Sequence, residues 1–301
     1  MARARTILAI SVLLAACGGS SERSPFEDGS SSGASGSSSS GGSSSGFGGS
    51  SSGGIDAGAT DECRKMDIVF VVDNSGSMSQ EQDNLAANFP KFITTLDGFR
   101  TKSGEPLDYR VAVTNTDASR SADTGKFRTT GTSCSAGPGR PWLEKADGDI
   151  GPFFSCRAKM GTSGSASEQG LEAMKHAVTS RVTDGSNSDG GKAFLRDDAL
   201  MAFLILTDED ETNSNSIDGY VQAFDNVKGD RSRWAAAAIA GETSCNSTFG
   251  SAREAKRLKE FIGKVGANGI FSSICAGDLT EGLTKALNTF QGACRNFVPV
   301  K

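Results

Sequence analysis

The chain has 301 residues, a formal net charge of −5 and a single histidine, His176. This acidic balance argues against a nucleic-acid binder, which normally carries a basic face. One histidine is too few for a histidine-rich metal site, and His176 is the single candidate for histidine-based catalysis. The chain is rich in glycine (38 residues) and serine, and much of this excess lies before residue 60, while the remainder has the composition of one globular domain.

Residues 1–17 have the pattern of a secretory signal peptide. Arg3 and Arg5 precede the apolar run Ile7–Ala16, which is shorter than the roughly 20 residues that span a bilayer. The run ends in Leu-Ala-Ala-Cys17, which resembles the lipobox of bacterial lipoproteins and implies a diacylated Cys17. An ordinary signal peptide that happens to contain a cysteine is the alternative. The resemblance implies a lipid-anchored, extracytoplasmic protein of the cell envelope, at the outer membrane or cell surface rather than the inner membrane.

Residues 18–60 are rich in serine and glycine and contain few large apolar residues. Such a segment cannot bury enough surface to offset the entropy of ordering it. We expect a disordered tether with a root-mean-square span of about 35 Å. It would hold the domain of residues 61–301 away from the membrane.

Seven cysteines are present, and six remain once Cys17 is assigned to lipidation. An even set in an exported domain is typical of disulfides, although six cysteines allow about 15 pairings. No CxxC pair is present, which argues against a metal cluster. The pairing that we favour is Cys63–Cys294, Cys134–Cys156 and Cys245–Cys275.

Strand and helix patterns alternate along the domain. Apolar runs predict buried parallel strands, at residues 66–73, 109–114, 200–207, 234–240 and 270–275, and the first of these runs is rich in β-branched residues. Apolar residues at helical spacing predict helices at 79–96 (kinked by Pro90), 167–179, 216–227, 252–265 and 279–290. Residues 116–160 are expected to form an elaborated loop. This alternation predicts an α/β fold, a doubly wound and mainly parallel sheet with helices on both faces, Rossmann-like and stabilised by disulfides.

Polar residues follow two of the predicted strands. Asp73-Asn-Ser75-Gly-Ser77 comes directly after the first strand, and Asp208 ends the run Leu-Ile-Leu-Thr-Asp. Open α/β sheets bind ligands outside the carboxyl ends of their strands. Carboxylate and hydroxyl oxygens there suit Mg²⁺, Mn²⁺ or Ca²⁺ rather than zinc or copper. The alternative to a metal site is that Ser77 only caps the helix that follows.

The order of these residues resembles the von Willebrand factor type A (VWA) family over residues 63–295. The metal-ion-dependent adhesion site of that family has the pattern D-x-S-x-S, then a threonine, then an aspartate. Asp73, Ser75 and Ser77 match the first part, and Asp208 matches the last. Spacing from Leu171 puts Ser165 in the place of the threonine, with Thr162 as the alternative. The glycine that usually follows the second aspartate is replaced here by Glu209-Asp210-Glu211, which predicts a more acidic rim.

The resemblance implies a binding module rather than an enzyme. A divalent cation, Mg²⁺ before Mn²⁺ or Ca²⁺, would keep one position open for a carboxylate of a protein ligand. The membrane would be contacted through the lipid anchor alone, and nucleic acid is not an expected partner.

Two other functions are compatible with parts of the sequence. Asp208-Glu-Asp210-Glu-Thr212 also resembles the D-x-D-x-T motif of haloacid-dehalogenase-like phosphatases, in which the first aspartate attacks phosphorus and Mg²⁺ assists. That family opens with the motif, whereas here it lies deep in the domain, and the D-x-S-x-S segment would be left unexplained. A metal-free structural envelope lipoprotein is the third possibility.

Overall fold

A computed structural model describes residues 63–118, 122–131 and 133–299. The predicted signal peptide with its lipidation residue, Cys17, and the predicted tether of residues 18–60 lie outside the described residues. In the described part of the chain, no helix combines the length and the apolar character that crossing a membrane requires.

A six-stranded sheet forms the centre of the domain, as the alternating pattern predicts. Its order is β10-β7-β6-β1-β2-β3, and only the edge pair β2–β3 is antiparallel. The chain moves outward from β1 in one direction and later returns to fill the other side. The strands are β1 (Lys65–Val72), β2 (Asp108–Asn115), β3 (Leu143–Glu144), β6 (Leu200–Leu206), β7 (Trp234–Ala240) and β10 (Gly269–Ser273).

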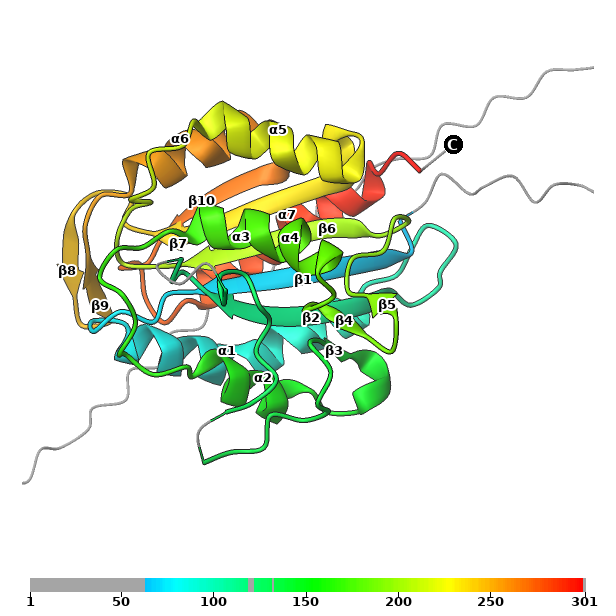
Figure 1. The fold of residues 1–301 in the computed structure, drawn as a ribbon, viewed down its shortest axis with the longest axis horizontal. Coiled ribbons are helices and arrows are strands. Elements are labelled where there is room, and N and C mark those ends of the chain that lie inside the picture. The colour runs from blue at the N-terminus through cyan, green and yellow to red at the C-terminus, as the bar shows by residue number, and fades with distance from the viewer. Residues whose placement is uncertain (1–62, 119–121, 132, 300–301) are drawn as a thin grey trace, which may run out of the picture. The chain divides into compact units, whose positions relative to one another are not determined.

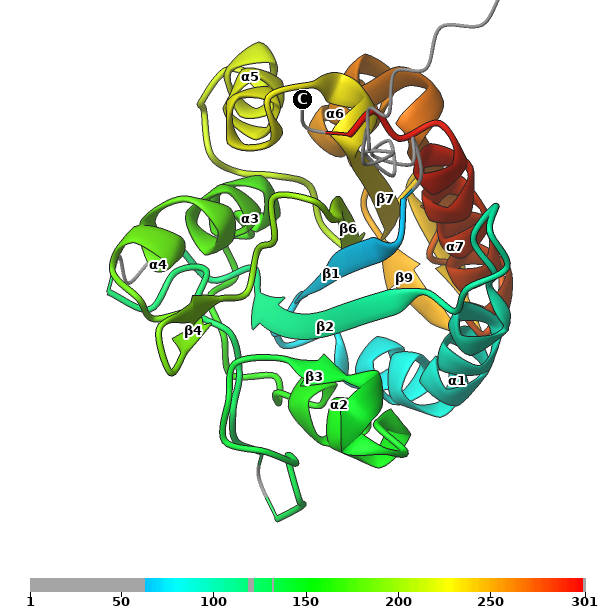
Figure 2. The ribbon, with the colours of Figure 1, turned by 90° about the vertical axis from the view of Figure 1, so that its right-hand side faces the viewer.

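Helices cover both faces of the sheet (Figures 1 and 2). One face carries α1 (Ser79–Gly98), α2 (Gly151–Ala158) and α7 (Thr280–Arg295); the other carries α3 (Gly170–Val178), α4 (Ser180–Thr183), α5 (Ile217–Lys228) and α6 (Lys256–Val265). Single 3₁₀ turns occur at Lys145–Asp147, Arg231–Arg233 and Gly266–Asn268. Every residue of β6 and β7 is buried, as expected for parallel strands covered on both sides. The doubly wound α/β prediction is confirmed.

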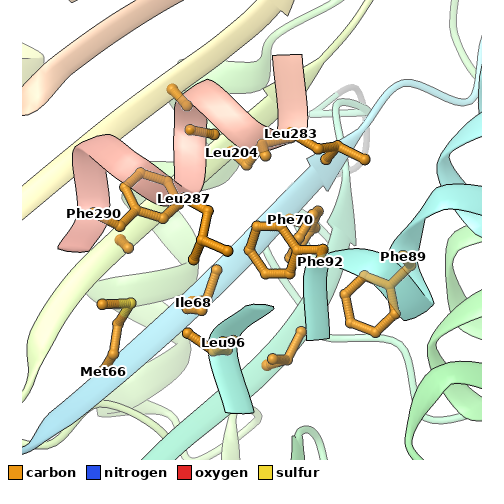
Figure 3. Close-up of a cluster of buried hydrophobic side chains, with 14 of the residues drawn as sticks. Met66, Ile68, Phe70, Phe89, Phe92, Leu96, Leu204, Leu283, Leu287 and Phe290 are labelled. Atoms are coloured by element: carbon orange, nitrogen blue, oxygen red, sulfur yellow. The ribbon is translucent and has the colours of Figure 1, made fainter. Parts of the chain in front are cut away.

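Phe70 of β1 lies at the centre of the core on the α1/α7 face (Figure 3). Its ring makes edge contacts with Phe89 and Phe92 of α1, at centroid distances of 5.6 Å and 5.5 Å, and with Phe154 of α2 at 4.8 Å. Burying one such side chain contributes about 1.5–3 kcal/mol. This aromatic cluster fixes α1, and with it the loop that joins β1 to α1.

The predicted loop of residues 116–160 contains a helix, α2, that the sequence analysis missed. The helix is only eight residues long and begins with a Gly-Pro pair, a weak signal in a Gly/Ser-rich stretch. It also explains how α1 continues through Pro90. Proline has no N–H for the carbonyl of Ala86, and the Ser155 hydroxyl of α2 donates to that carbonyl at 3.0 Å.

Three disulfides are present in the pairing favoured above: Cys63–Cys294, Cys134–Cys156 and Cys245–Cys275. The first ties the start of β1 to the end of α7. The third ties a short hairpin, β8 (Cys245–Ser247) and β9 (Gly250–Ala252), to the turn after β10. That hairpin was not predicted; a second small one is formed by β4 (Ser188–Asp189) and β5 (Lys192–Ala193).

Candidate functional site

The site lies where the strand order reverses, between β1 and β6. Asp73 is the first residue after β1, and Asp208 is the second residue after β6. The Asp73 N–H donates to the Leu206 carbonyl at 2.9 Å. Both side chains are buried, at 0 % and 5 % exposure. The topology therefore brings the two predicted carboxylates to the same edge of the sheet, where α/β folds bind ligands.

Hydrogen bonds fix Asp73 in position. Its Oδ1 accepts from the Ser75 N–H at 2.7 Å, and its Oδ2 accepts from the Thr207 hydroxyl at 2.6 Å. The Gln82 amide donates at 2.9 Å to the carbonyls of both Asp73 and Gly161. Gln82 thus ties the β1–α1 loop to a second loop, residues 159–169.

Ser77 links the first loop to Asp208. The hydroxyl oxygens of Ser75 and Ser77 are 3.5 Å apart, and Ser77 donates a hydrogen bond to the Asp208 carboxylate. Burial raises the pKa of Asp208 to about 6, and the neighbouring charge of Asp73 adds to the shift while the Ser77 hydrogen bond opposes it. Asp208 Oδ1 has no hydrogen-bond partner. Four of the predicted ligands, Asp73, Ser75, Ser77 and Asp208, are therefore neighbours.

The two candidates for the hydroxyl of the 159–169 loop occupy different surroundings. Ser165 is partly buried, and its Oγ accepts from the Ser167 N–H at 3.0 Å. Thr162 is exposed. The 159–169 loop contacts the β1–α1 loop at Gly164, whose N–H donates to the Asn74 carbonyl at 2.8 Å. Both residues stay candidates for the hydroxyl position.

Glu168 is a site residue that the sequence analysis missed. Its side chain is 1 % exposed, its Oε2 accepts from the Thr116 hydroxyl, and its carboxyl group is within hydrogen-bonding reach of Asp73. Burial raises its pKa to about 8, and the charge of Asp73 contributes further. The only signal in the sequence is an acidic residue two positions before the Gly170 that begins α3.

Glu81, in the first turn of α1, is a second buried carboxylate near the pair. It is 2 % exposed, and burial raises its pKa, with Asp208 and Asp73 adding to the effect. The β8–β9 hairpin closes over it at Gly250, where an added Cβ would lie 1.8 Å from Glu81 Oε1. The hairpin (brown-gold in Figure 1) therefore borders the site at the carboxyl edge of the sheet.

The acidic segment after Asp208 adds less charge to the rim than predicted. Asp210 accepts from the backbone N–H groups of Arg257 and Leu258, in the first turn of α6. Glu211 is buried and accepts from the Leu171 N–H of α3 at 2.6 Å. Helix N-termini attract carboxylates in this way, so these two side chains cap helices. This use of Asp210 also argues against a phosphatase, in which it would have to exchange a proton with a substrate.

The chemistry of the donors fits a hard divalent cation. Among the described residues, no group of three His, Cys, Asp or Glu side chains is arranged as a ready-made metal cluster, so carboxylates alone do not form a cage. Two serine hydroxyls adjoin Asp73 and Asp208, and three buried carboxylate oxygens lack partners, on Glu81, Glu168 and Asp208. Buried charges of one sign are costly unless a counter-charge offsets them. A cation at this point would supply it, with Asp73, Ser75, Ser77 and Asp208 as its holders.

The raised pKa of Glu168 predicts how the stability of the ion-free protein depends on pH. The pKa of Glu168 is about 8 in the folded state and 4.5 in the unfolded state. Between these two values the folded protein keeps a proton that the unfolded protein has released. The contribution of Glu168 to the free energy of unfolding is therefore largest below pH 4.5, and this contribution is lost as the pH rises towards 8. We expect thermal unfolding in EDTA to occur at a lower temperature at pH 8 than at pH 5, and Glu168→Gln to flatten this slope. Parallel slopes for the two proteins would contradict the assignment.

Comparison with known proteins gives similarities of structure only. No protein-family model and no curated protein sequence matches the chain. A solved structure of proximal thread matrix protein 1 from the mussel byssus is 14 % identical to this chain, with a TM-score of 0.43, and the match covers 76 % of this chain and 49 % of that protein. A second structure of the same protein, described as having a "zinc occupied MIDAS motif", is also 14 % identical, with a TM-score of 0.41. That match covers 77 % of this chain and 46 % of the mussel chain. The open form of the pilus adhesin SpaC from Lactobacillus rhamnosus GG is 11 % identical over 78 % of this chain and 31 % of its own, with a TM-score of 0.41. This chain thus spans about half of the mussel protein and about a third of the adhesin.

Proposed function

We propose that this domain is a VWA-like binding module that holds one divalent cation and uses it to bind a carboxylate of a protein ligand. Asp73, Ser75, Ser77 and Asp208 would hold the ion, with Ser165 or Thr162 adding a hydroxyl. Mg²⁺ is the first candidate, and Mn²⁺ and Ca²⁺ are the alternatives. The observation that carries the proposal is the pair of buried carboxylates after adjacent strands at the point where the sheet order reverses.

The residues present suit binding rather than turnover. Serine hydroxyls are neutral ligands, so they leave more of the ion's positive charge available to an incoming carboxylate than acidic ligands would. Asp73 is oriented by Ser75 and Thr207, and Asp208 by Ser77, so no large rearrangement of either is needed. The proposed role asks no residue to act as nucleophile or proton shuttle.

Lipidation at Cys17 and a flexible tether over residues 18–60 complete the proposal. A diacylated cysteine gives stable membrane attachment, where a single acyl chain is marginal. The disulfides agree with an extracytoplasmic location, because they persist in oxidising compartments. The module would then face a partner in the envelope or on another cell.

Acetate tests the carboxylate-binding step directly. We expect the Mn²⁺-loaded protein to accelerate proton relaxation of acetate, because coordination brings the methyl group next to the paramagnetic ion. Acetamide, which has the same shape and no charge, is the matched control and should relax far less. Equal relaxation of acetate and acetamide would contradict an open, electrophilic coordination position.

A further inference from the structure

Glu168 is held rigidly at the site from both its backbone and its side chain. Its carbonyl accepts from the N–H and from the hydroxyl of Thr212, each at 2.7 Å. Its Oε2 accepts from the hydroxyl of Thr116, just after β2. Two loops and a strand end therefore fix where this carboxyl group lies, and the 1 % exposure of the residue shows that the position is closed to solvent.

The carboxyl group of Glu168 faces that of Asp73, and in the ion-free protein only a proton carried by Glu168 itself can link the two groups. The two groups are within hydrogen-bonding reach of one another, yet Glu168 Oε1 receives no hydrogen bond. A buried, unpartnered carboxylate oxygen is costly. A second such oxygen, Asp208 Oδ1, lies in the same site. A structural role as acceptor for Thr116 explains one oxygen of Glu168, whereas the other lies against the Asp73 carboxyl group, where a cation could take the place of the proton.

We propose that Glu168 is a direct ligand of the divalent ion, held between its Oε1 and the carboxylate of Asp73. This inference rests on the ion site proposed above and extends it. The sequence predicted a neutral hydroxyl, Ser165 or Thr162, from this loop; a carboxylate brings a full negative charge instead. Asp73 and Glu168 together balance the two charges of the ion, and Asp208 adds a third negative charge nearby.

This ligand set changes which ion and which partner the site prefers. Ca²⁺ accepts six to eight oxygens in flexible geometry, and its affinity rises with the charge of its ligands, whereas Mg²⁺ requires near-ideal octahedral geometry. Glu168 should therefore favour Ca²⁺ over Mg²⁺. It also makes the ion less electrophilic, so it lowers the affinity of the loaded site for a partner's carboxylate.

Calorimetric titration of Ca²⁺ and Mg²⁺ into the purified protein and its Glu168→Gln variant tests the proposal. Glutamine can still accept from Thr116 through its amide oxygen, so it preserves the structural hydrogen bond and removes the charge. We expect Ca²⁺ affinity to fall roughly tenfold or more and the preference for Ca²⁺ over Mg²⁺ to shrink, given how strongly ligand charge sets affinity at such sites. Acetate relaxation by the Mn²⁺-loaded variant should increase.

Glu209→Gln is the matched control. Glu209 lies beside Asp208, and its carboxylate is 3.5 Å from the guanidinium of Arg253; it contributes to the local field without occupying the proposed coordination position. We expect its Ca²⁺ affinity to fall by no more than about threefold, because the partner Arg253 is exposed to solvent, which screens charge pairs of this kind. Equal losses in both variants would show that Glu168 acts only through its field, and would overturn the proposal.

Folding and the underlying site are checked by two further measurements. Glu168→Gln should raise the unfolding temperature in EDTA at pH 8, because the glutamine amide can donate to Asp73 where Glu168 has begun to lose its proton, and it should reduce the increase that Ca²⁺ produces. Glu168→Asp serves if the glutamine variant does not fold. Unchanged Ca²⁺ affinity in a folded Glu168 variant, with binding lost in Asp73→Asn, would overturn the role of Glu168 alone. Absence of any ion binding by the parent protein would overturn the ion site itself.

Discussion

Replacement of Asp73 by asparagine is expected to reduce divalent-ion affinity by at least about 100-fold, since changes to the outer shell of a metal site alone cost about 10–100-fold. Asparagine has the size of aspartate, and its amide oxygen can still accept from Ser75 or from Thr207. The loss would therefore report the missing charge rather than a collapsed loop. Calorimetric titration with Mn²⁺ measures it, and thermal unfolding in EDTA checks that the variant is folded.

Asp83→Asn is the matched control for this substitution. Asp83 lies in the same stretch of chain, on the exposed side of α1, where it pairs with Lys159 at 2.8 Å. Removing its charge changes the net charge of the protein equally, so Mn²⁺ affinity should stay within about threefold of the parent, in line with the small energies of exposed charge pairs. Parent-like affinity in Asp73→Asn would rule out this site.

The largest effect on stability is expected from the Cys63→Ser, Cys294→Ser double variant. This disulfide closes a loop of 231 residues, whereas Cys134–Cys156 and Cys245–Cys275 close loops of 22 and 30. In the chain-entropy model the free energy of unfolding should fall by about 5.5 kcal/mol, some 2 kcal/mol more than for either shorter loop. Both cysteines are buried at 2 % exposure, and the bond joins the first strand to the last helix.

Urea unfolding at equilibrium measures this difference. The Cys134→Ser, Cys156→Ser variant is the control, because it also removes one disulfide but one that closes a loop of only 22 residues. The entropic account would be contradicted if the short-loop variant lost as much stability as the long-loop variant. A change in the m-value would show in addition that the unfolded state had expanded.

The strands of the sheet centre could be predicted from the sequence because burial on both faces leaves a direct signature. β1, β6 and β7 are nearly continuous apolar runs, and each lies within one residue of its predicted position. The helix α2 could not be predicted, because its eight residues carry little periodicity of their own. It is held against α1 by the contact of Phe154 with Phe89 and by the hydrogen bond of Ser155. Its existence depends on tertiary contacts.

The candidate site was predictable where it depends on the strands alone. Asp73 directly follows β1 and Asp208 comes two residues after the end of the parallel neighbour β6, so the position of one fixes the position of the other. Glu168 reaches the site from the loop before α3, whose path depends on hydrogen bonds to Thr116 and Thr212. The acidic run after Asp208 was interpreted as a charged rim, whereas Asp210 caps a helix that begins 46 residues later. Such contacts between distant segments leave no local pattern.

The most direct test of the ion site is an anomalous difference map from crystals grown with Mn²⁺. The account predicts a single strong peak enclosed by Asp73, Ser75, Ser77 and Asp208, with Glu168 Oε1 among its nearest oxygens. A peak elsewhere, or no peak at a Mn²⁺ concentration that saturates the protein in solution, would contradict the account and leave the domain as a metal-free scaffold.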